Sequence, residues 1–257
     1  TTALVGPVAA QTVKLAWSQD ATGLDPHRQT AFSSIRLLEL LYEPLVRLDP
    51  DAEIVPAVAA SWAFNDTATE LTVTLDPDAT FHDGSAVTSA DVKASFERIL
   101  NEETGAASRA NFTSIAEMET PDDGTVVFKL SEPNVPILTA MASINAAIVP
   151  ASAVAAGTIG TEVVGSGPFV FGDWTPNSNA SLTANPNWGG GAVAIDGLDI
   201  SVLPDETAIL AALRTKQVDF ALINDPFVAT LIPGVPGVQL VKKPVLSYHV
   251  LQLNPSR

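Results

Sequence analysis

The sequence predicts an α/β protein, because strand-like and helix-like segments alternate along it. Its 257 residues, 46% of them hydrophobic, suffice to bury one large core or two smaller ones. The segment TVKLAWS (12–18) alternates apolar side chains with polar or small ones, as a half-buried strand does. The segment SSIRLLELLYEPL (33–45) carries apolar residues at helical spacing, and Pro44 ends that helix. Gly23 and Pro26 predict a long loop between the two.

The middle of the chain predicts a small α/β unit of its own. ELTVTL (70–75) and TVVFKL (125–130) alternate apolar and polar residues and read as strands, the second preceded by an Asp-Gly turn. Between them, residues 89–101 place their apolar side chains on one helical face. Thr88 precedes Asp91 by three residues, the spacing of a helix N-terminal cap.

The last third predicts three short strands, a helix and a buried strand, in the segments 167–174, 180–186, 197–203, 206–217 and 218–223. Asp205 precedes the helix and suits its N-cap. A strand, a helix and a strand in this order favour a parallel crossover, which is nearly always right-handed.

Composition excludes several classes of function. The net charge is −16 and the basic residues are scattered, so we expect no nucleic-acid partner and no anionic membrane surface. The chain has no cysteine, and its histidines (His27, His82 and His249) lie far apart, so neither a metal site nor a cofactor is expected. The apolar stretch 137–157 is interrupted by polar residues and proline, which indicates a buried element and not a membrane span. Residues 1–10 suit a tether or the end of a signal peptide.

One cluster leaves a catalytic alternative open. His82, Asp83 and Ser85 lie within four positions and would allow a hydrolase. Three residues on one turn rarely point at a single substrate, because a base must reach its nucleophile and be oriented by a third group. Asp83 and Gly84 also suit an ordinary turn.

Seven segments in chain order resemble one family. They are LDPH (24–27), LYEPLVRLDP (41–50), PAVAASW (56–62), FHDGSAVTSADVKASFERI (81–99), GSGPFVFGDW (165–174), NPNWGGG (185–191) and ILAALRTKQVDFALI (209–223). Together they are similar to the extracellular solute-binding proteins of family 5, the oligopeptide-, dipeptide- and nickel-binding receptors of ABC importers.

The resemblance implies a periplasmic-binding-protein-like fold, type II, cluster C. Residues 1–46 and 165–257 would form a discontinuous and incomplete first ligand-binding lobe, and residues 47–164 an inserted α/β domain. Family members are much longer, so we expect the chain to be the N-terminal part of a receptor. The second lobe is then absent, and solute binding by this part alone is expected to be weak.

The resemblance implies the solute-recognition component of an ABC importer, not an enzyme. It would bind peptides or a similar small solute by closure of two lobes, as a monomer in the periplasm or tethered to the outer face of the cytoplasmic membrane. Its membrane partner would be an ABC permease. A nickel chelate, an opine or an oligosaccharide stays open as solute, because one fold serves many ligands. The alternatives are the hydrolase above and a solute sensor without transport.

Ligand residues are also carried over from the resemblance. They lie in the loop after the first strand, in the segment after VDFAL and on the strand toward the second lobe: Gln29, Thr30, Ala31, Phe32, Ile223, Asn224, Asp225 and Gln252. Polar and aromatic groups on a loop held by a rigid strand suit recognition. The alternatives are ordinary surface loops and, for Gln252, a buried glutamine bonded to backbone.

One position departs from the family pattern. Lys216 stands where glycine is usual at the end of the helix 206–217. A left-handed residue there costs a non-glycine side chain roughly 1 kcal/mol or more, so we expect the helix end to differ locally.

Overall fold

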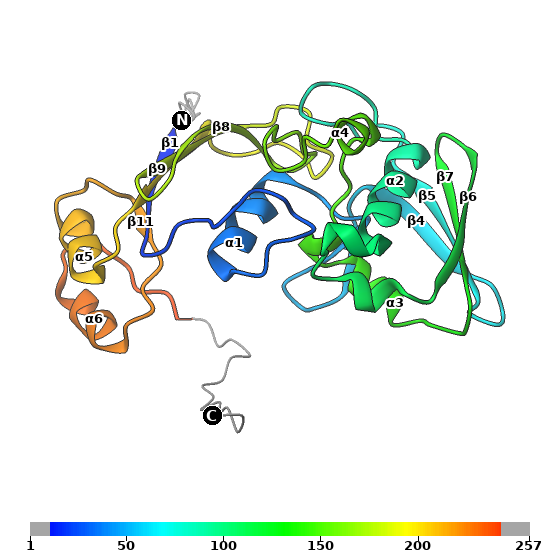
Figure 1. Ribbon diagram of the computed structural model, residues 1–257. Helices are drawn as coiled ribbons and strands as arrows, with labels where there is room; N and C mark the ends of the chain where they lie inside the picture. Colours follow the sequence, from blue (N-terminus) through cyan, green and yellow to red (C-terminus); the bar gives the residue numbers. More distant parts are fainter. Residues whose placement is uncertain (1–10, 243–257) are drawn as a thin grey trace, which may run out of the picture.

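The computed structural model describes residues 11–242. Figure 1 shows two α/β units: one contains β1, β8, β9 and β11 with helices α5 and α6, and the other contains β4–β7 with helix α2. His249 and Gln252 lie outside the described residues.

The first unit is built on a five-stranded sheet with the order β11-β1-β10-β9-β8. Its strands are β1 (Thr12–Trp17), β8 (Phe169–Thr175), β9 (Asn179–Ala184), β10 (Gly197–Val202) and β11 (Phe220–Ala221). β1 pairs in parallel with both β10 and β11, while β9 is antiparallel to its neighbours. Helix α5 (Glu206–Arg214) connects β10 to β11. The predicted parallel crossover is therefore confirmed.

The strand predicted over 218–223 is shorter than expected. Only Phe220 and Ala221 pair with β1, and Phe220 is 50% exposed. β11 is the edge of the sheet, so only one of its sides has a strand partner. The prediction of a buried strand was wrong for this residue, whereas Val218 is buried.

The second unit is an antiparallel sheet with the order β4-β5-β7-β6. Its strands are β4 (Ala59–Phe64), β5 (Glu70–Leu75), β6 (Ile115–Asp122) and β7 (Thr125–Leu130), next to a small ribbon of β2 (Val46–Leu48) and β3 (Ile54–Pro56). Helix α2 (Ser89–Leu100) buries Val92, Phe96 and Ile99 as predicted. The ring of Phe96 meets those of Phe112 and Phe128 edge to face, each at 5.1 Å between centroids.

Short helices complete the described fold. They are α1 (Phe32–Leu41), α3 (Ile137–Met141), α4 (Ala151–Ala156), α6 (Pro226–Leu231), and the 3₁₀ turns η1 (Glu102–Thr104), η2 (Arg109–Phe112), η3 (Ile144–Ala146) and η4 (Ile232–Gly234). The apolar stretch 137–157 forms α3, η3 and α4. Across residues 11–242, no helix combines the length and the apolar character needed to cross a bilayer.

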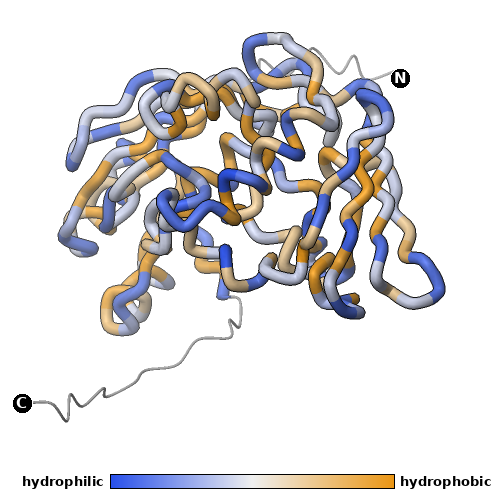
Figure 2. The backbone as a smooth tube through the Cα atoms, turned by 45° about the vertical axis from the view of Figure 1, so that its right-hand side comes forward, coloured by the Kyte–Doolittle hydropathy of each residue, from blue (hydrophilic) through white to orange (hydrophobic). Residues whose placement is uncertain are grey.

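Each of the two units has its own main hydrophobic core. Figure 2 shows apolar stretches at many places along the chain and hydrophilic stretches at many loop tips. The segment 146–149, which leaves η3 and continues as extended chain from Ala147, lies between the cores: Ala146 and Ile148 belong to the core of the four-stranded sheet, and Ala147 and Val149 to that of the five-stranded sheet. Successive residues of an extended chain point in opposite directions, so one segment serves both cores. The domain boundaries at 46/47 and 164/165 stay a prediction.

The start of helix α2 has the predicted cap. The carboxylate of Asp91 accepts hydrogen bonds from the backbone N of Thr88 (2.8 Å) and from its hydroxyl (2.7 Å). Its other oxygen accepts from the backbone N of Ala151 at 2.8 Å. One buried carboxylate thus holds the starts of both α2 and α4.

Helix α5 ends in a left-handed turn at the position where the sequence departs from the family pattern. Lys216 has φ 57°, in the left-handed region that glycine favours. The backbone N of Gln217 still bonds the carbonyl of Ala212 at 2.9 Å, the bond that closes a Schellman turn. The turn is retained because its hydrogen bonds and the buried Val218 that follows fix the backbone.

Candidate functional site

The predicted ligand segments follow two neighbouring parallel strands. β1 ends at Trp17 and β11 at Ala221, and Ala16 is paired with Ala221. In open α/β sheets, ligands bind outside the carboxyl ends of the parallel strands. Both segments therefore start from the edge at which such a site is expected.

In the first segment, some side chains support the loop and others face solvent. The side-chain oxygen of Gln29 accepts a hydrogen bond from the hydroxyl of Thr22 at 2.9 Å. Thr30 is exposed, Ala31 is the N-cap residue of α1, and Phe32 begins that helix with 72% of its surface exposed. Phe32 is thus the most prominent apolar group of this segment.

In the second segment, Glu206 organises the backbone. Its carboxylate accepts from the backbone N of Asn224 (3.0 Å) and of Asp225 (2.8 Å). Asp225 in turn caps α6 by accepting from the backbone N of Phe227 at 2.7 Å. Ile223 packs against the small cores around α5 and α6. Within residues 11–242, no hydrogen bond joins this segment to residues 29–32.

Two features of this edge were missed by the sequence reasoning. Phe227 is 69% exposed directly after the predicted segment, and Asp225 followed by Pro226 was a readable helix start. The guanidinium of Arg36 lies 4.6 Å from the ring centroid of Trp17 and 5.5 Å from that of Phe32. Burial lowers the pKa of Arg36 from its ordinary value, and we found no sequence signal for this stacking.

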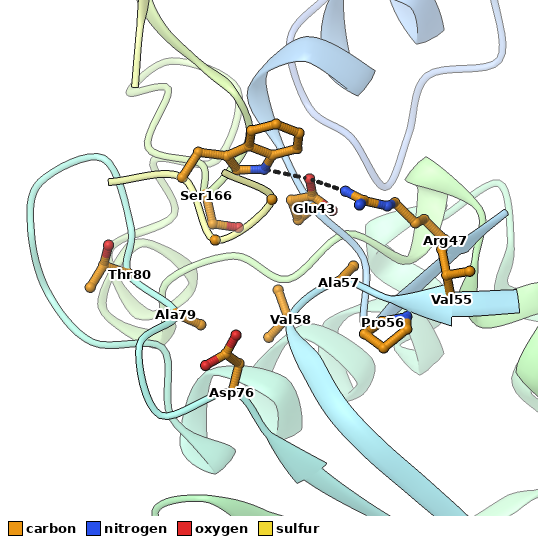
Figure 3. A pocket seen from close by; sticks show the side chains of 13 residues that line it. Glu43, Arg47, Val55, Pro56, Ala57, Val58, Asp76, Ala79, Thr80 and Ser166 are labelled. Carbon is orange, nitrogen blue, oxygen red and sulfur yellow. Dashed lines mark hydrogen bonds and ion pairs between the residues drawn. The ribbon is translucent and has the colours of Figure 1, made fainter. Parts of the chain in front are cut away.

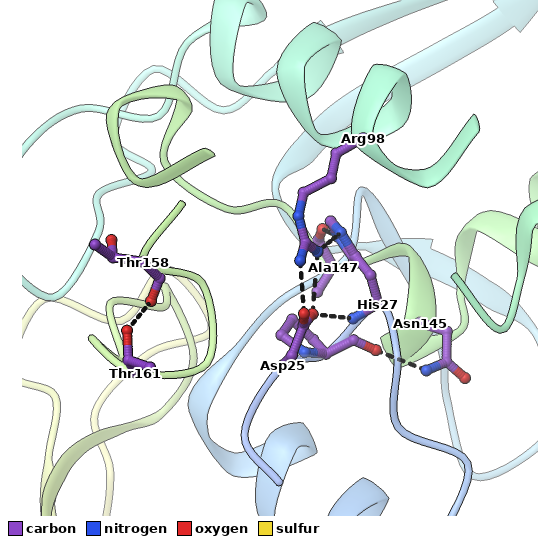
Figure 4. A network of polar contacts seen from close by, with 8 residues as sticks. Asp25, His27, Arg98, Asn145, Ala147, Thr158 and Thr161 are labelled. Carbon is purple, nitrogen blue, oxygen red and sulfur yellow. Dashed lines mark hydrogen bonds and ion pairs between the residues drawn. The ribbon is translucent and has the colours of Figure 1, made fainter. Parts of the chain in front are cut away.

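A buried network holds the loop that carries the first segment (Figure 4). Arg98 on α2 donates to both oxygens of Asp25, at 2.6 and 3.0 Å, and to Nδ1 of His27 at 2.8 Å. Because Nδ1 accepts, the proton of His27 sits on Nε2, which donates to the carbonyl of Ala147 at 2.9 Å. His27 is fully buried, and burial, helped by Arg98, lowers its pKa to about 4.

The side chain of Asn145 fixes the same loop by bonding to the loop's backbone carbonyls. Its amide nitrogen donates to the carbonyls of Pro26 (2.6 Å) and Gln29 (2.8 Å), and Figure 4 shows Asn145 reaching toward this loop. The loop after β1 is therefore anchored at several points to residues from other parts of the chain, which keeps Phe32 in place.

The His82 cluster lacks the geometry of a nucleophile and its base. Nδ1 of His82 accepts from the backbone N of Gly165 at 3.3 Å, and Nε2 donates to the carbonyl of Gly167 at 3.1 Å. The hydroxyl of Ser85 donates to Asp83 at 2.6 Å, and no hydrogen bond joins it to His82. Burial lowers the pKa of His82, which keeps the ring neutral in this structural role.

A second cluster of polar side chains, formed by Glu43, Arg47 and Trp188, lies beside two pockets. The indole N–H of Trp188 donates to Glu43 at 2.8 Å, and Arg47 approaches the same oxygen at 3.7 Å. Burial raises the pKa of Glu43, more than Trp188 and Arg47 lower it. Pockets of about 310 and 440 Å³ adjoin this group, and Figure 3 shows the first. Among the described residues, no group of three potential metal ligands is present.

Comparison with known proteins assigns the family. Residues 53–257 match the model of the bacterial extracellular solute-binding proteins, family 5. The chain belongs to this family. The structure also has the fold of type II periplasmic binding proteins.

Curated relatives are longer than this chain. A putative ABC transporter peptide-binding protein of Brucella ovis is 34% identical over 198 residues, which cover 74% of this chain and 37% of the relative. The probable D,D-dipeptide-binding periplasmic protein DdpA of Escherichia coli K12 is 29% identical over 228 residues, covering 84% of this chain and 44% of the relative. The chain thus spans less than half the length of these relatives.

Solved structures give the same picture. The protein AgaA of A. tumefaciens R10, solved in complex with agropinic acid, is 33% identical with a TM-score of 0.83, covering 88% of this chain and 46% of AgaA. DppA of Helicobacter pylori, solved with the peptide STSA, is 23% identical with a TM-score of 0.79, covering 88% and 49%. The second likeness bears on the fold alone.

Proposed function

We propose that the chain is the larger part of the first lobe, with its inserted domain, of a receptor that delivers a peptide or similar small solute to an ABC permease. The receptor acts outside the cytoplasmic membrane, in the periplasm or tethered to the membrane's outer face, and works as a monomer. Residues 1–46 and 165–257 belong to the lobe, and residues 47–164 to the inserted domain. No bond is made or broken.

One observation carries the proposal: exposed aromatic rings follow the carboxyl ends of two adjacent parallel strands, on anchored backbones. Phe32 and Phe227 are 72% and 69% exposed. A well-ordered aromatic ring loses little conformational entropy on binding and covers a large area of ligand. Closure of a second lobe over this edge buries the solute between the two surfaces.

The remaining predicted residues divide by role. Thr30 and Asn224 are exposed and available to the solute, whereas Gln29, Asp225 and Ile223 mainly support the segments. Gln252 lies outside the described residues and stays a predicted ligand residue. The family membership and the peptide-binding relatives support this arrangement.

The test is isothermal titration of the whole receptor with three probes: tri-alanine, D-alanyl-D-alanine and agropinic acid. We expect one of them to bind, and Phe32→Ala to weaken that binding about tenfold or more, because aromatic anchors contribute most to an interface. Val135→Ala is the matched control, an exposed apolar residue in the inserted domain. Equal affinities of the two variants for the bound probe contradict the proposed site.

A further inference from the structure

The pocket beside Trp188 has features of a ligand site that the proposed receptor function does not use. Its volume is about 310 Å³, within the range of sites for small molecules. It contains none of the residues 29–32 or 223–225. The side chain of Arg47 on its wall is 40% exposed, so the pocket opens to solvent there.

Two hydroxyl groups in this pocket lack partners. Ser166 is only 6% exposed, and its Oγ has no hydrogen-bond partner among the described residues. Thr80 also lines the pocket, and its buried hydroxyl has no hydrogen-bond partner among the described residues either. Figure 3 shows Ser166 pointing into the space between Thr80 and Glu43. A buried hydroxyl without a partner costs about 1–3 kcal/mol, so its retention here calls for a polar group in the pocket.

The pocket carries Asp76 on one side and the ion pair of Glu43 and Arg47 on the other. Asp76 contributes a carboxylate, and one of its oxygens accepts from the backbone N of Asp78 at 3.0 Å. Figure 3 shows Asp76 and Thr80 on the side away from Arg47. Arg47 is held only loosely by Glu43, at 3.7 Å, and therefore keeps donors available for another carboxylate.

Apolar side chains form part of the pocket wall between these charges. Val55, Pro56, Val58 and Ala79 line it together with the indole of Trp188. A small aliphatic side chain fits such a wall, and the guanidinium of Arg47 lies 5.6 Å from the ring centroid of Trp188. A bare metal ion does not fit, because Glu43 and Asp76 are the pocket's two carboxylates and no third potential ligand joins them among the described residues.

We propose that this pocket binds the zwitterion of a small α-amino acid. Its ammonium group lies between Asp76, Ser166 and Thr80, and its carboxylate meets the guanidinium of Arg47. The two unpartnered hydroxyls and the loosely held arginine then all gain partners.

The probe is L-alanine, titrated into the 257-residue chain by calorimetry. We expect saturable binding to one site, with n-propylamine and propionate each at least about tenfold weaker, because each lacks one of the two charged ends. Equal affinity for n-propylamine overturns the zwitterion assignment, and no measurable heat with L-alanine overturns the site.

Matched variants locate the site. Asp76→Asn keeps the bond to the backbone of Asp78 and should weaken alanine binding about tenfold, since a charge-assisted hydrogen bond becomes neutral. The control Asp78→Asn removes the same charge two residues away, from an exposed side chain. If Asp78→Asn weakens binding as much as Asp76→Asn, attraction by overall charge explains the binding and the inference fails.

Ser166→Ala separates binding from structure. Its hydroxyl has no partner in the described chain, so the variant should weaken alanine binding several-fold while its melting temperature stays equal or rises. Unchanged affinity together with a lower melting temperature overturns the role of Ser166 as a ligand group. Phe32→Ala should leave alanine binding unchanged; if it abolishes that binding, alanine occupies the solute site, and this inference fails while the proposed function stands.

Discussion

Two polar contacts between the two units of the protein differ in how completely they are satisfied. The closed contact (Asp25, His27 and Arg98) is buried, and each of its side chains has a hydrogen-bond partner. The hollow contact (Glu43, Arg47 and Trp188) has one short hydrogen bond and one long ion pair, and it adjoins two pockets. The closed contact is tightly packed and holds one arrangement of its residues, whereas the hollow contact leaves space for a ligand.

The difference shows how the same kinds of residue serve different ends. A fully satisfied buried network fixes one arrangement of the chain, because any other arrangement leaves a charge without a partner. A group that is only partly hydrogen-bonded and lies next to a pocket keeps donors or acceptors free for a ligand in that pocket. The closed contact therefore fixes the loop that leads to Phe32, whereas the hollow contact lies beside two pockets with its ion pair at 3.7 Å.

The largest expected effect is from breaking the closed contact. Arg98→Ala leaves the carboxylate of Asp25 buried without its ion partner, which typically destabilises a protein by about 3–5 kcal/mol. Urea unfolding measures the loss. The control is Lys93→Ala, which breaks an exposed ion pair with Glu97 on the same helix and should lose about 1 kcal/mol or less. Similar losses of unfolding free energy in both variants would show that the closed contact contributes no more to stability than an exposed ion pair.

The two contacts should respond to acid in opposite directions. The pKa of folded His27 is about 4, below the 6.5 of the unfolded chain, so the unfolded state binds more protons as pH falls. Its contribution to stability is complete above pH 6.5 and is lost toward pH 4, by roughly 2 kcal/mol at pH 5. Urea midpoints between pH 7 and 5 measure this loss, which should disappear in His27→Gln.

Protonation of Glu43 changes the stability of the folded state in the opposite direction to protonation of His27. Its folded pKa is raised by burial, so the folded state binds the proton more readily, and its destabilising contribution is relieved as pH falls through the raised value. In Glu43→Gln, the acid-induced loss should therefore be steeper than in the parent protein. A shallower pH dependence in this variant contradicts the contrast between the two contacts.

A smaller effect is expected from the hollow contact itself. Trp188→Phe removes the indole donor to Glu43 and should cost about 1–2 kcal/mol, because a hydrogen bond to a charged group is lost but water can enter from the adjoining pockets. Urea unfolding again measures it, in parallel with Arg98→Ala. A loss as large as that of Arg98→Ala would mean that both contacts are equally closed.

Local pattern predicted the elements but not the contacts. The helix α2 and strands β1, β5 and β7 follow from periodicity, since each has a regular apolar face. Strands β4 and β6 were not predicted, and each shows a register shift, which interrupts regular alternation. Arg98 and Asp25 lie 73 residues apart, and Trp188 and Glu43 145 apart, so no local pattern marks either pair.

The candidate site shows the same limit. Residues 29–32 and 223–225 were placed by resemblance, and the pattern of the sequence alone did not select them. Phe227 could have been found, because Asp225 and Pro226 announce a helix whose next residue is an aromatic ring. The support of these segments by Glu206 and Asn145 depends on tertiary packing, which a single sequence does not display.

The smallest effect tests whether the closed contact depends on the helix that carries Arg98. Thr88→Ala removes the hydroxyl that donates to Asp91 at the start of α2 and should cost about 1 kcal/mol. Ser85→Ala, an exposed hydroxyl outside the helix, is the control. Because Thr88 and Arg98 share no partner, the losses in the double variant with Arg98→Ala should add within about 0.5 kcal/mol. A loss in the double variant that is clearly smaller than the sum of the two single losses would show that the cap stabilises the protein mainly by placing Arg98. Helix α2 would then be part of the closed contact.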